Sequence, residues 1–168
     1  EKDIIGKKDS SDNDAQRVQL KLKPLEGLRF NLEGTSARID TRYVGALTLA
    51  EFKANPSQNG GNEYNHQKLE ADVWRIGGEF DITPNLNISA NHIQEYKTSD
   101  FISPFALLTD YDYAFDDFAL QYHGETLNVI AGMQTFDGSR KDDGSAFSPA
   151  NKASKDNTGY FAQTEYRF

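Results

Sequence analysis

Apolar and polar residues alternate in seven segments spread along this chain, and this period of two residues is the feature that most restricts its fold. Successive side chains of a β-strand point to opposite faces, so the alternation predicts strands with one apolar and one polar face. The alternating segments are 17–23, 28–33, 69–82, 86–91, 117–123, 127–134 and 160–168. Within 69–82 the apolar positions shift by one residue near Trp74, which predicts a β-bulge there. We therefore predict an all-β fold of about seven strands, each about nine residues or longer, the length of a membrane-crossing strand.

The connections between these segments alternate in length. Three are short and rich in turn residues, and they cover 23–27, 83–85 and 123–126. Long polar stretches lie between them, near 41–66, 98–114 and 138–156. An antiparallel up-and-down meander then has its short turns at one end and its long loops at the other, as outer-membrane barrels do. We expect 1–168 to form a single segment of a transmembrane β-barrel, without a plug domain or signal peptide; an eighth strand could be drawn only from 41–53.

Alternation alone does not say which face of the strands is enclosed. A soluble barrel of the lipocalin type turns its apolar face inward with the same period. An outward apolar face is favoured here because that face is rich in Ala, Gly and Thr, which fill a core poorly, while the polar face mixes charges and amides. Aromatic residues also gather near the expected strand ends, as they do at membrane interfaces: Phe80, Tyr96, Phe115, Tyr122, Phe136, Tyr160, Tyr166 and Phe168.

Four segments of the chain resemble known barrel segments in their residue types, order and spacing. The closing run is Asp156 to Phe168 (DNTGYFAQTEYRF), and it resembles a barrel strand of TonB-dependent outer-membrane receptors. The run from Lys7 to Pro24 is similar to an outer loop followed by a strand, and Leu28 to Asp40 resembles the strand that returns. Ile130 to Asp137 (IAGMQTFD) looks like the strand that precedes a long outer loop. The resemblance covers nearly the whole chain.

The resemblance implies a function in transport across the bacterial outer membrane. The segment would form barrel wall and extracellular loops of a receptor for a ferric siderophore or a similar nutrient. Its partners would be outer-membrane lipid, the nutrient, and a plug domain and TonB system that are reached through parts of the receptor missing from this segment. An isolated sheet would leave two unpaired edges, which could pair in a homo-oligomer. The alternative that the residues leave open is a complete small β-barrel that serves as a binding or adhesion module.

Aromatic residues among amides in the expected outer loops are the best candidates for ligand contact. An aromatic ring supplies contact area, and neighbouring amides set the orientation of a flat or sugar-like ligand. The candidate residues are Tyr43, Tyr64, Phe101, Phe105, Tyr111 and Tyr113.

The sequence gives no reason to expect an enzyme, a cofactor or a metal site. Cys is absent, so thiolate ligands and thiol nucleophiles are excluded. His66, His92 and His123 lack zinc spacing, and residues 136–144 (FDGSRKDDG) lack the pattern of a calcium loop. The carboxylates of 110–117 have no evident substrate pocket for acid–base chemistry. A net charge of −8 without a basic stripe also argues against nucleic acid as a partner.

Overall fold

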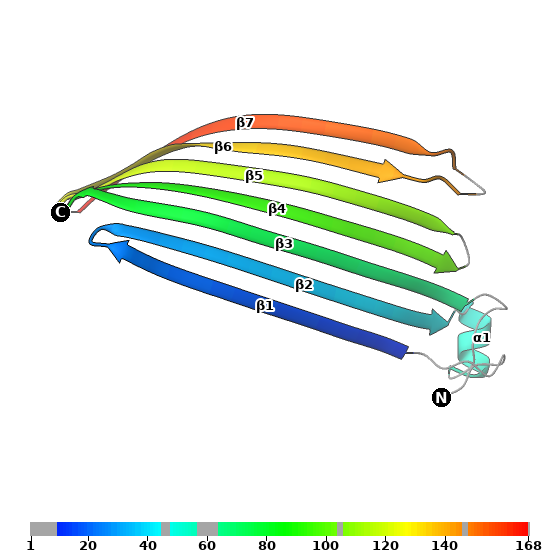
Figure 1. Cartoon of the computed structure of the whole chain (residues 1–168). Helices are drawn as coiled ribbons and strands as arrows, with labels where there is room; N and C mark the ends of the chain where they lie inside the picture. The colour runs from blue at the N-terminus through cyan, green and yellow to red at the C-terminus, as the bar shows by residue number, and fades with distance from the viewer. Residues whose placement is uncertain (1–9, 45–47, 57–63, 104–105, 146–147, 168) are drawn as a thin grey trace.

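A computed structural model describes residues 10–44, 48–56, 64–103, 106–145 and 148–167. Seven strands form one sheet in which each strand pairs antiparallel with its neighbours in the chain, in the order β1-β2-β3-β4-β5-β6-β7 (Figure 1). The strands are β1 (Ser10–Leu25), β2 (Leu28–Val44), β3 (Tyr64–Thr83), β4 (Leu86–Ser103), β5 (Leu107–His123), β6 (Leu127–Asp142) and β7 (Asn151–Tyr166). The predicted all-β meander is confirmed.

The tight turns all lie at one end of the sheet, which we name the turn end, and the opposite end is the loop end (Figure 1). The short connections β1–β2, β3–β4 and β5–β6 fall at the predicted turns. The long loops are predicted wrongly in part, because strands of 16 to 20 residues extend into them. Only residues 104–106 separate β4 from β5, and β6 continues to Asp142. Charged residues that resemble a loop in sequence are paired here through their backbones.

No eighth strand occupies the described part of 41–53. After β2 comes a short helix, α1 (Leu49–Ala54), at the loop end (Figure 1). Its first turn is fixed by a capping box: the backbone N–H of Glu51 donates to Thr48 Oγ1 (3.3 Å), and the backbone N–H of Thr48 donates to Glu51 Oε2 (2.8 Å). This local pairing accounts for a helix where the sequence offered only a weak strand pattern.

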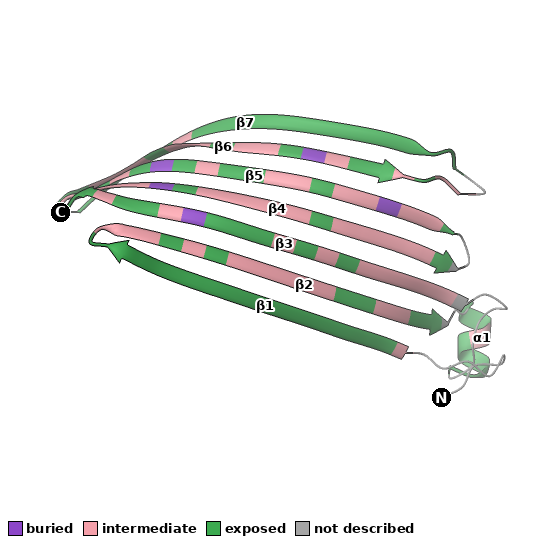
Figure 2. Ribbon diagram, in the orientation of Figure 1, coloured by how far each residue is buried: buried purple, intermediate pink, exposed green. Residues whose placement is uncertain are grey.

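The sheet is a single layer without a hydrophobic core (Figure 2). Ala119 is the one buried apolar side chain among the described residues, while Leu20 and Phe30 remain 47% and 42% exposed. The chain exposes 11946 Å², whereas a compact monomer of its mass would expose about 8,300 Å². Across the described residues, β1 and β7 also pair only with β2 and β6, so the sheet is open. Its apolar surface therefore needs a cover that this layer does not provide.

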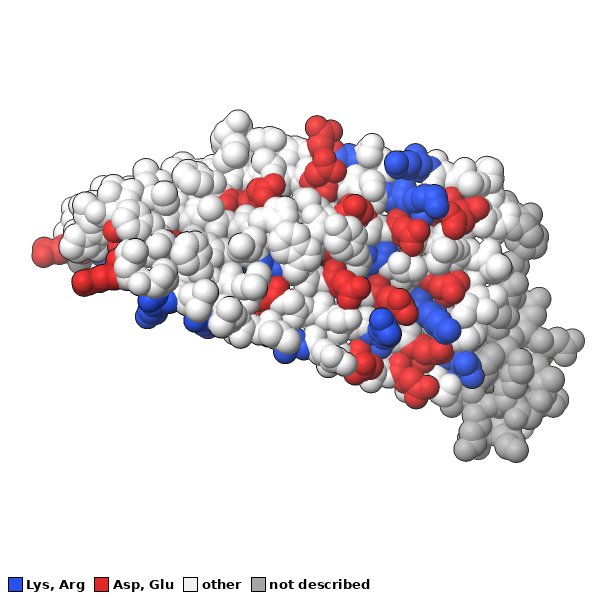
Figure 3. All heavy atoms as spheres, in the orientation of Figure 1, with Lys and Arg blue, Asp and Glu red and all other residues white. Residues whose placement is uncertain are grey.

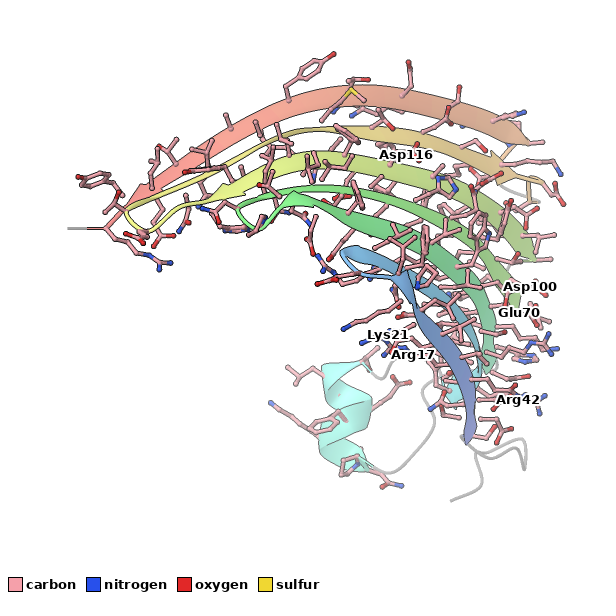
Figure 4. All side chains as sticks on the ribbon, turned by 60° about the vertical axis from the view of Figure 1, so that its left-hand side comes forward. Arg17, Lys21, Arg42, Glu70, Asp100 and Asp116 are labelled. Atoms are coloured by element: carbon pink, nitrogen blue, oxygen red, sulfur yellow. The ribbon has the colours of Figure 1, made fainter. Side chains whose placement is uncertain are left out.

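The sheet is curved, and its two faces can be assigned from the register, because directly opposed residues share a face. Figure 4 shows Glu70, Asp100 and Arg42 on the convex side, and Arg17 and Lys21 on the concave side. One transverse row on the convex face runs Leu20–Leu32–Ile76–His92–Asp116–Thr135–Thr158. Residues that lie an even number of positions along a strand from a member of this row are also on the convex face.

In the half of the sheet next to the turns, the convex face carries a continuous apolar surface, which we name the apolar band. Charged residues gather instead toward the loop end of the same face (Figure 3). The band consists of Leu20, Leu22, Leu28, Phe30, Leu32, Trp74, Ile76, Gly78, Phe80, Ile82, Leu86, Ile88, Ala90, Phe118, Leu120, Tyr122, Leu127, Val129, Ala131, Met133, Tyr160 and Ala162.

The apolar side chains change face along β3, and this corrects the bulge predicted at Trp74. Pairing of β3 with β2 and β4 is continuous through Trp74, which lies opposite Gly34 and Gln94. Leu69 and Val73 therefore lie on the concave face, whereas Trp74 and Ile76 lie on the convex face. The sequence pattern shifted because the apolar side of the sheet changes between its two halves, and the backbone stays in register.

Gly132 is required by close packing on the concave face. A Cβ built there would meet the carbonyl oxygen of Phe118 and the ring of Phe161, which covers the glycine. Gly132→Ala is expected to destabilise the sheet by about 1–3 kcal/mol because backbone cannot move aside cheaply. Gly159 is the matched control, since nothing lies within 4 Å of a Cβ built on it. Urea titration of both variants in detergent micelles checks the difference; equal stabilities would contradict it.

Candidate ligand-binding face

Near the turn end, the concave face carries a network of ion pairs and side-chain hydrogen bonds. Arg29 donates to both oxygens of Asp81 (2.6 and 2.7 Å) and to Glu79 (2.9 Å). Asn87 also donates to Asp81 at 2.9 Å. The two acceptors and the guanidinium satisfy one another across β2, β3 and β4, so this region is polar but internally paired.

Nearer the loop end, the concave face carries aromatic rings flanked by cations, which we name the Tyr111 cluster: Lys97, Tyr111, Tyr113, Phe115, Phe136 and Arg140. Tyr111 lies between the two cations, with Lys97 Nζ and the Arg140 guanidinium carbon each 5.8 Å from its ring centroid. Both distances are within cation–π range. Ring contacts then continue from Tyr111 to Tyr113 (5.8 Å), on to Phe136 (5.8 Å), and to Phe115 (4.9 Å).

A hollow of about 590 Å³ adjoins this cluster at the middle of the concave face. Phe115, Phe136 and Ile93 form apolar walls, and Arg75, Asn157 and Asp117 contribute polar groups. Within the described residues, Arg75 has no carboxylate within ion-pair distance, unlike Arg17 and Arg29. Arg75 faces Glu33 on the neighbouring strand without a direct ion pair, so its guanidinium can still donate into the hollow. Rings beside such a guanidinium suit a flat ligand with negative charge.

The structure brings together two of the six predicted ligand-contact residues. Tyr111 and Tyr113 belong to the Tyr111 cluster. Phe101 shares the concave face but pairs with Leu107 nearer the loop end, and Tyr43 lies at the end of β2, three strands away from β5. The side chain of Tyr64 and the whole of Phe105 lie outside the described residues.

Sequence reasoning missed the other members of the cluster. Phe115 and Phe136 were expected near membrane interfaces, but they lie on the concave face. The spacing of Tyr111, Tyr113 and Phe115 at every second residue could have placed the three on one face, had 98–114 been interpreted as strand. Lys97 and Arg140 could not be found in this way, because their approach to Tyr111 depends on the register of three strands.

The remaining candidate chemistry is dispersed. His66 contacts Asp40 (2.8 Å) and His92 contacts Asp116 (2.6 Å), both on the convex face, and neither dyad is joined by a third ligand. Asp137 and Asp142 lie on opposite faces of β6, which contradicts a shared calcium loop. Among the described residues no group of three or more His, Cys, Asp or Glu side chains could hold a metal ion.

Asp142 connects β5 to β6 next to the Tyr111 cluster. The Thr109 hydroxyl donates to Asp142 (2.8 Å), and the Arg140 guanidinium adds a second bond (3.0 Å). These donors, Thr109 first, hold the pKa of the Asp142 carboxyl below its usual range. A lowered pKa stabilises the folded state above the ordinary carboxyl pKa, and this contribution is lost as pH falls through the folded-state value.

We therefore expect acid to loosen the loop end of β5 and β6 below about pH 4. Amide chemical shifts of residues 107–110, followed by NMR in detergent micelles from pH 7 to pH 3, measure the change. Asp142→Asn should remove the transition, and Asp137→Asn on the opposite face should keep it. An identical transition in both variants would mean that another group is responsible.

No family model, curated protein or solved structure matches the chain. Within the described segments, no helix has the length and apolar character needed to cross a membrane.

Proposed function

We propose that this sheet is part of the wall of an outer-membrane β-barrel, with lipid on its convex face and an aqueous interior on its concave face. The observation that supports this most is the change of apolar side halfway along the strands. Near the turns, Phe80 and Leu120 belong to the apolar band while the concave face is charged. Near the loop end, the convex face carries Glu70 and Asp100 instead. A sheet that packed on a soluble partner would bury one face along its full length.

The size of the apolar band agrees with this proposal. On β3 the band extends from Trp74 to Phe80 in the paired register, and the exposed Ile82 follows at the end of the strand. The stretch from Trp74 to Ile82 spans about 26 Å at 3.3 Å per residue. Outer-membrane barrels carry an outward apolar band about 25 Å tall, with strands that tilt. The charged half of the strands would then stand above the bilayer in water.

We propose further that the loop half captures an anionic nutrient, such as a ferric siderophore, as the resemblance to TonB-dependent receptors suggests. The Tyr111 cluster and Arg75 would line the entrance to the barrel and supply rings and positive charge. Import would depend on a plug domain and a TonB system as partners. The alternative of a complete closed barrel receives no support, because β1 and β7 do not pair with each other in the described sheet.

Two measurements test the two levels of this proposal separately. Membrane insertion is tested by flotation of the refolded protein with liposomes after alkaline carbonate extraction; recovery in the soluble fraction would overturn it. Ligand capture is tested by equilibrium binding of iron-55-labelled catecholate and hydroxamate siderophores. Arg140→Met should weaken the preferred one about tenfold. Arg17→Met is the matched control, because Arg17 is also an ion-paired arginine of the concave face but lies on β1, away from the Tyr111 cluster. If none of the siderophores binds, the proposed ligand binding is overturned, while the proposal that the sheet is part of a barrel wall is unaffected.

A further inference from the structure

The convex face holds a shallow groove within the apolar band. Its floor is formed by Gly78 and Ala90, which are directly opposed on β3 and β4, and the groove has a volume of about 440 Å³. Phe30 and Phe118 form its two sides, and Ile76 and Met133 complete the apolar lining. The small residues leave an apolar space beside the aromatic rings, whose lining has the chemistry that an alkyl chain prefers.

Polar groups meet the groove only toward the loop end. His92 and Asp116 contribute to its lining there, joined by the 2.6 Å hydrogen bond between them. Asp116 also accepts from the Thr135 hydroxyl (3.1 Å), and its side chain is still 56% exposed. A carboxylate has about four acceptor positions, so Asp116 can accept further donors. Trp74, the only tryptophan of the chain, lies beside this rim with its ring 4.9 Å from that of His92.

The charged residues around this end of the groove are acidic. We consider three neighbouring transverse rows of the convex face: the row that contains His92 and the next two rows toward the loop end. These rows contain no Lys or Arg, and they contain five aspartates: Asp72, Asp112, Asp116, Asp137 and Asp156. Asp137 and Asp156 are directly opposed across β6 and β7. None of the five makes an ion pair with Lys or Arg in the part of the chain that the structure describes. Such a rim disfavours a headgroup with net negative charge and attracts a cationic donor.

We propose that the groove binds one acyl chain of a phospholipid with a primary ammonium headgroup, of the phosphatidylethanolamine class, and that the ammonium donates to Asp116. This inference rests on the proposed function, because it requires the convex face to meet lipid. The groove supplies contact for the chain, and the acidic rim selects the headgroup. A quaternary ammonium has no N–H to donate, and a phosphatidylglycerol headgroup carries uncompensated negative charge.

Trp74 reports occupancy of the groove directly. The protein is reconstituted in phosphatidylcholine nanodiscs, and its fluorescence is followed as phosphatidylethanolamine, phosphatidylglycerol or phosphatidylcholine with brominated acyl chains is added. Brominated phosphatidylethanolamine is expected to reach half-maximal quenching at a mole fraction about fivefold lower than brominated phosphatidylcholine, with phosphatidylglycerol the weakest. Asp116→Asn should remove the preference for phosphatidylethanolamine and leave quenching by the other two lipids.

Gly78→Leu fills the groove, since a Cβ there already lies 3.3 Å from the Phe30 ring, and it should abolish the preference. Gly34→Leu is the matched control on the same face, where nothing lies within 4 Å of the added Cβ. This control variant should keep the preference for phosphatidylethanolamine. Equal quenching by all three lipids would overturn the proposed lipid site, but it would still agree with a convex face that meets the bilayer. Quenching by phosphatidylglycerol that requires Mg²⁺ overturns it in favour of a bridging cation. Absence of quenching by any lipid overturns the proposed function itself.

Discussion

Replacing Leu120 by arginine is expected to destabilise the protein in a bilayer by about 2–4 kcal/mol, the cost of a cation at the lipid-facing midplane of an outer-membrane barrel. Leu120 is central in the apolar band, opposite Ile88 and Ala131, and is 43% exposed. No carboxylate of the band can pair with the new guanidinium. The free energy of unfolding from phospholipid vesicles, obtained by urea titration, measures the change.

The neighbouring residue provides the control. Gln121 points to the concave face, opposite Asn87 and Ile130, where water and polar groups are expected. Gln121→Arg should therefore change the free energy of unfolding by less than about 1 kcal/mol. The reverse order, with Gln121→Arg more damaging than Leu120→Arg, would mean that the concave face is the buried one.

Without lipid or detergent, the chain is expected not to exist as a folded monomer. Its apolar band is exposed and both edge strands offer unpaired N–H and C=O groups; Val18 on β1 is 73% exposed and Tyr160 on β7 is 81% exposed. Light scattering in detergent-free buffer should give masses several-fold above 18.8 kDa, and added detergent should lower them. A single species of monomer mass that unfolds cooperatively in plain buffer would contradict this expectation.

The direction of the edge strands limits how copies can associate. In the antiparallel order, β1 and β7 both run from the loop end to the turn end. Pairing of β1 with β7 of a second copy would be parallel, and pairing of two β1 strands would place the apolar bands of the two copies at opposite ends. Neither arrangement continues an antiparallel wall in one bilayer, so we expect assemblies in water to be heterogeneous.

Much of the fold could be predicted because each strand near the turns has one apolar and one polar face. Leu28 to Glu33 is such a segment, and the tight turn before it follows from Gly27, whose φ of 77° favours glycine. The loop half was harder, because both of its faces carry polar residues. Asp110 to Tyr113 alternates as regularly as any strand, but it lies in a long polar stretch, and such a stretch predicts a loop. Such residues are stable in a strand when both neighbours supply backbone partners.

The candidate site was predictable only in part for a related reason. Tyr111 and Tyr113 were identified by residue type, and their neighbourhood follows from the sheet register. The cation–π contacts of Lys97 and Arg140 join three strands and have no local signal in the sequence. The change of apolar face at Trp74 is visible in the sequence, but the same pattern also fits a β-bulge, and only the continuous register shows that the backbone is regular there.

The most direct test of the central claim is a nitroxide scan of β5 in bilayers. The chain has no Cys, so single cysteines can be introduced and labelled at each position from 116 to 122. Collision with oxygen, which concentrates in lipid, should peak at positions 118, 120 and 122, and collision with a water-soluble nickel complex should peak at 117 and 121. The opposite phase, or water access at every position, would contradict a convex face that meets lipid.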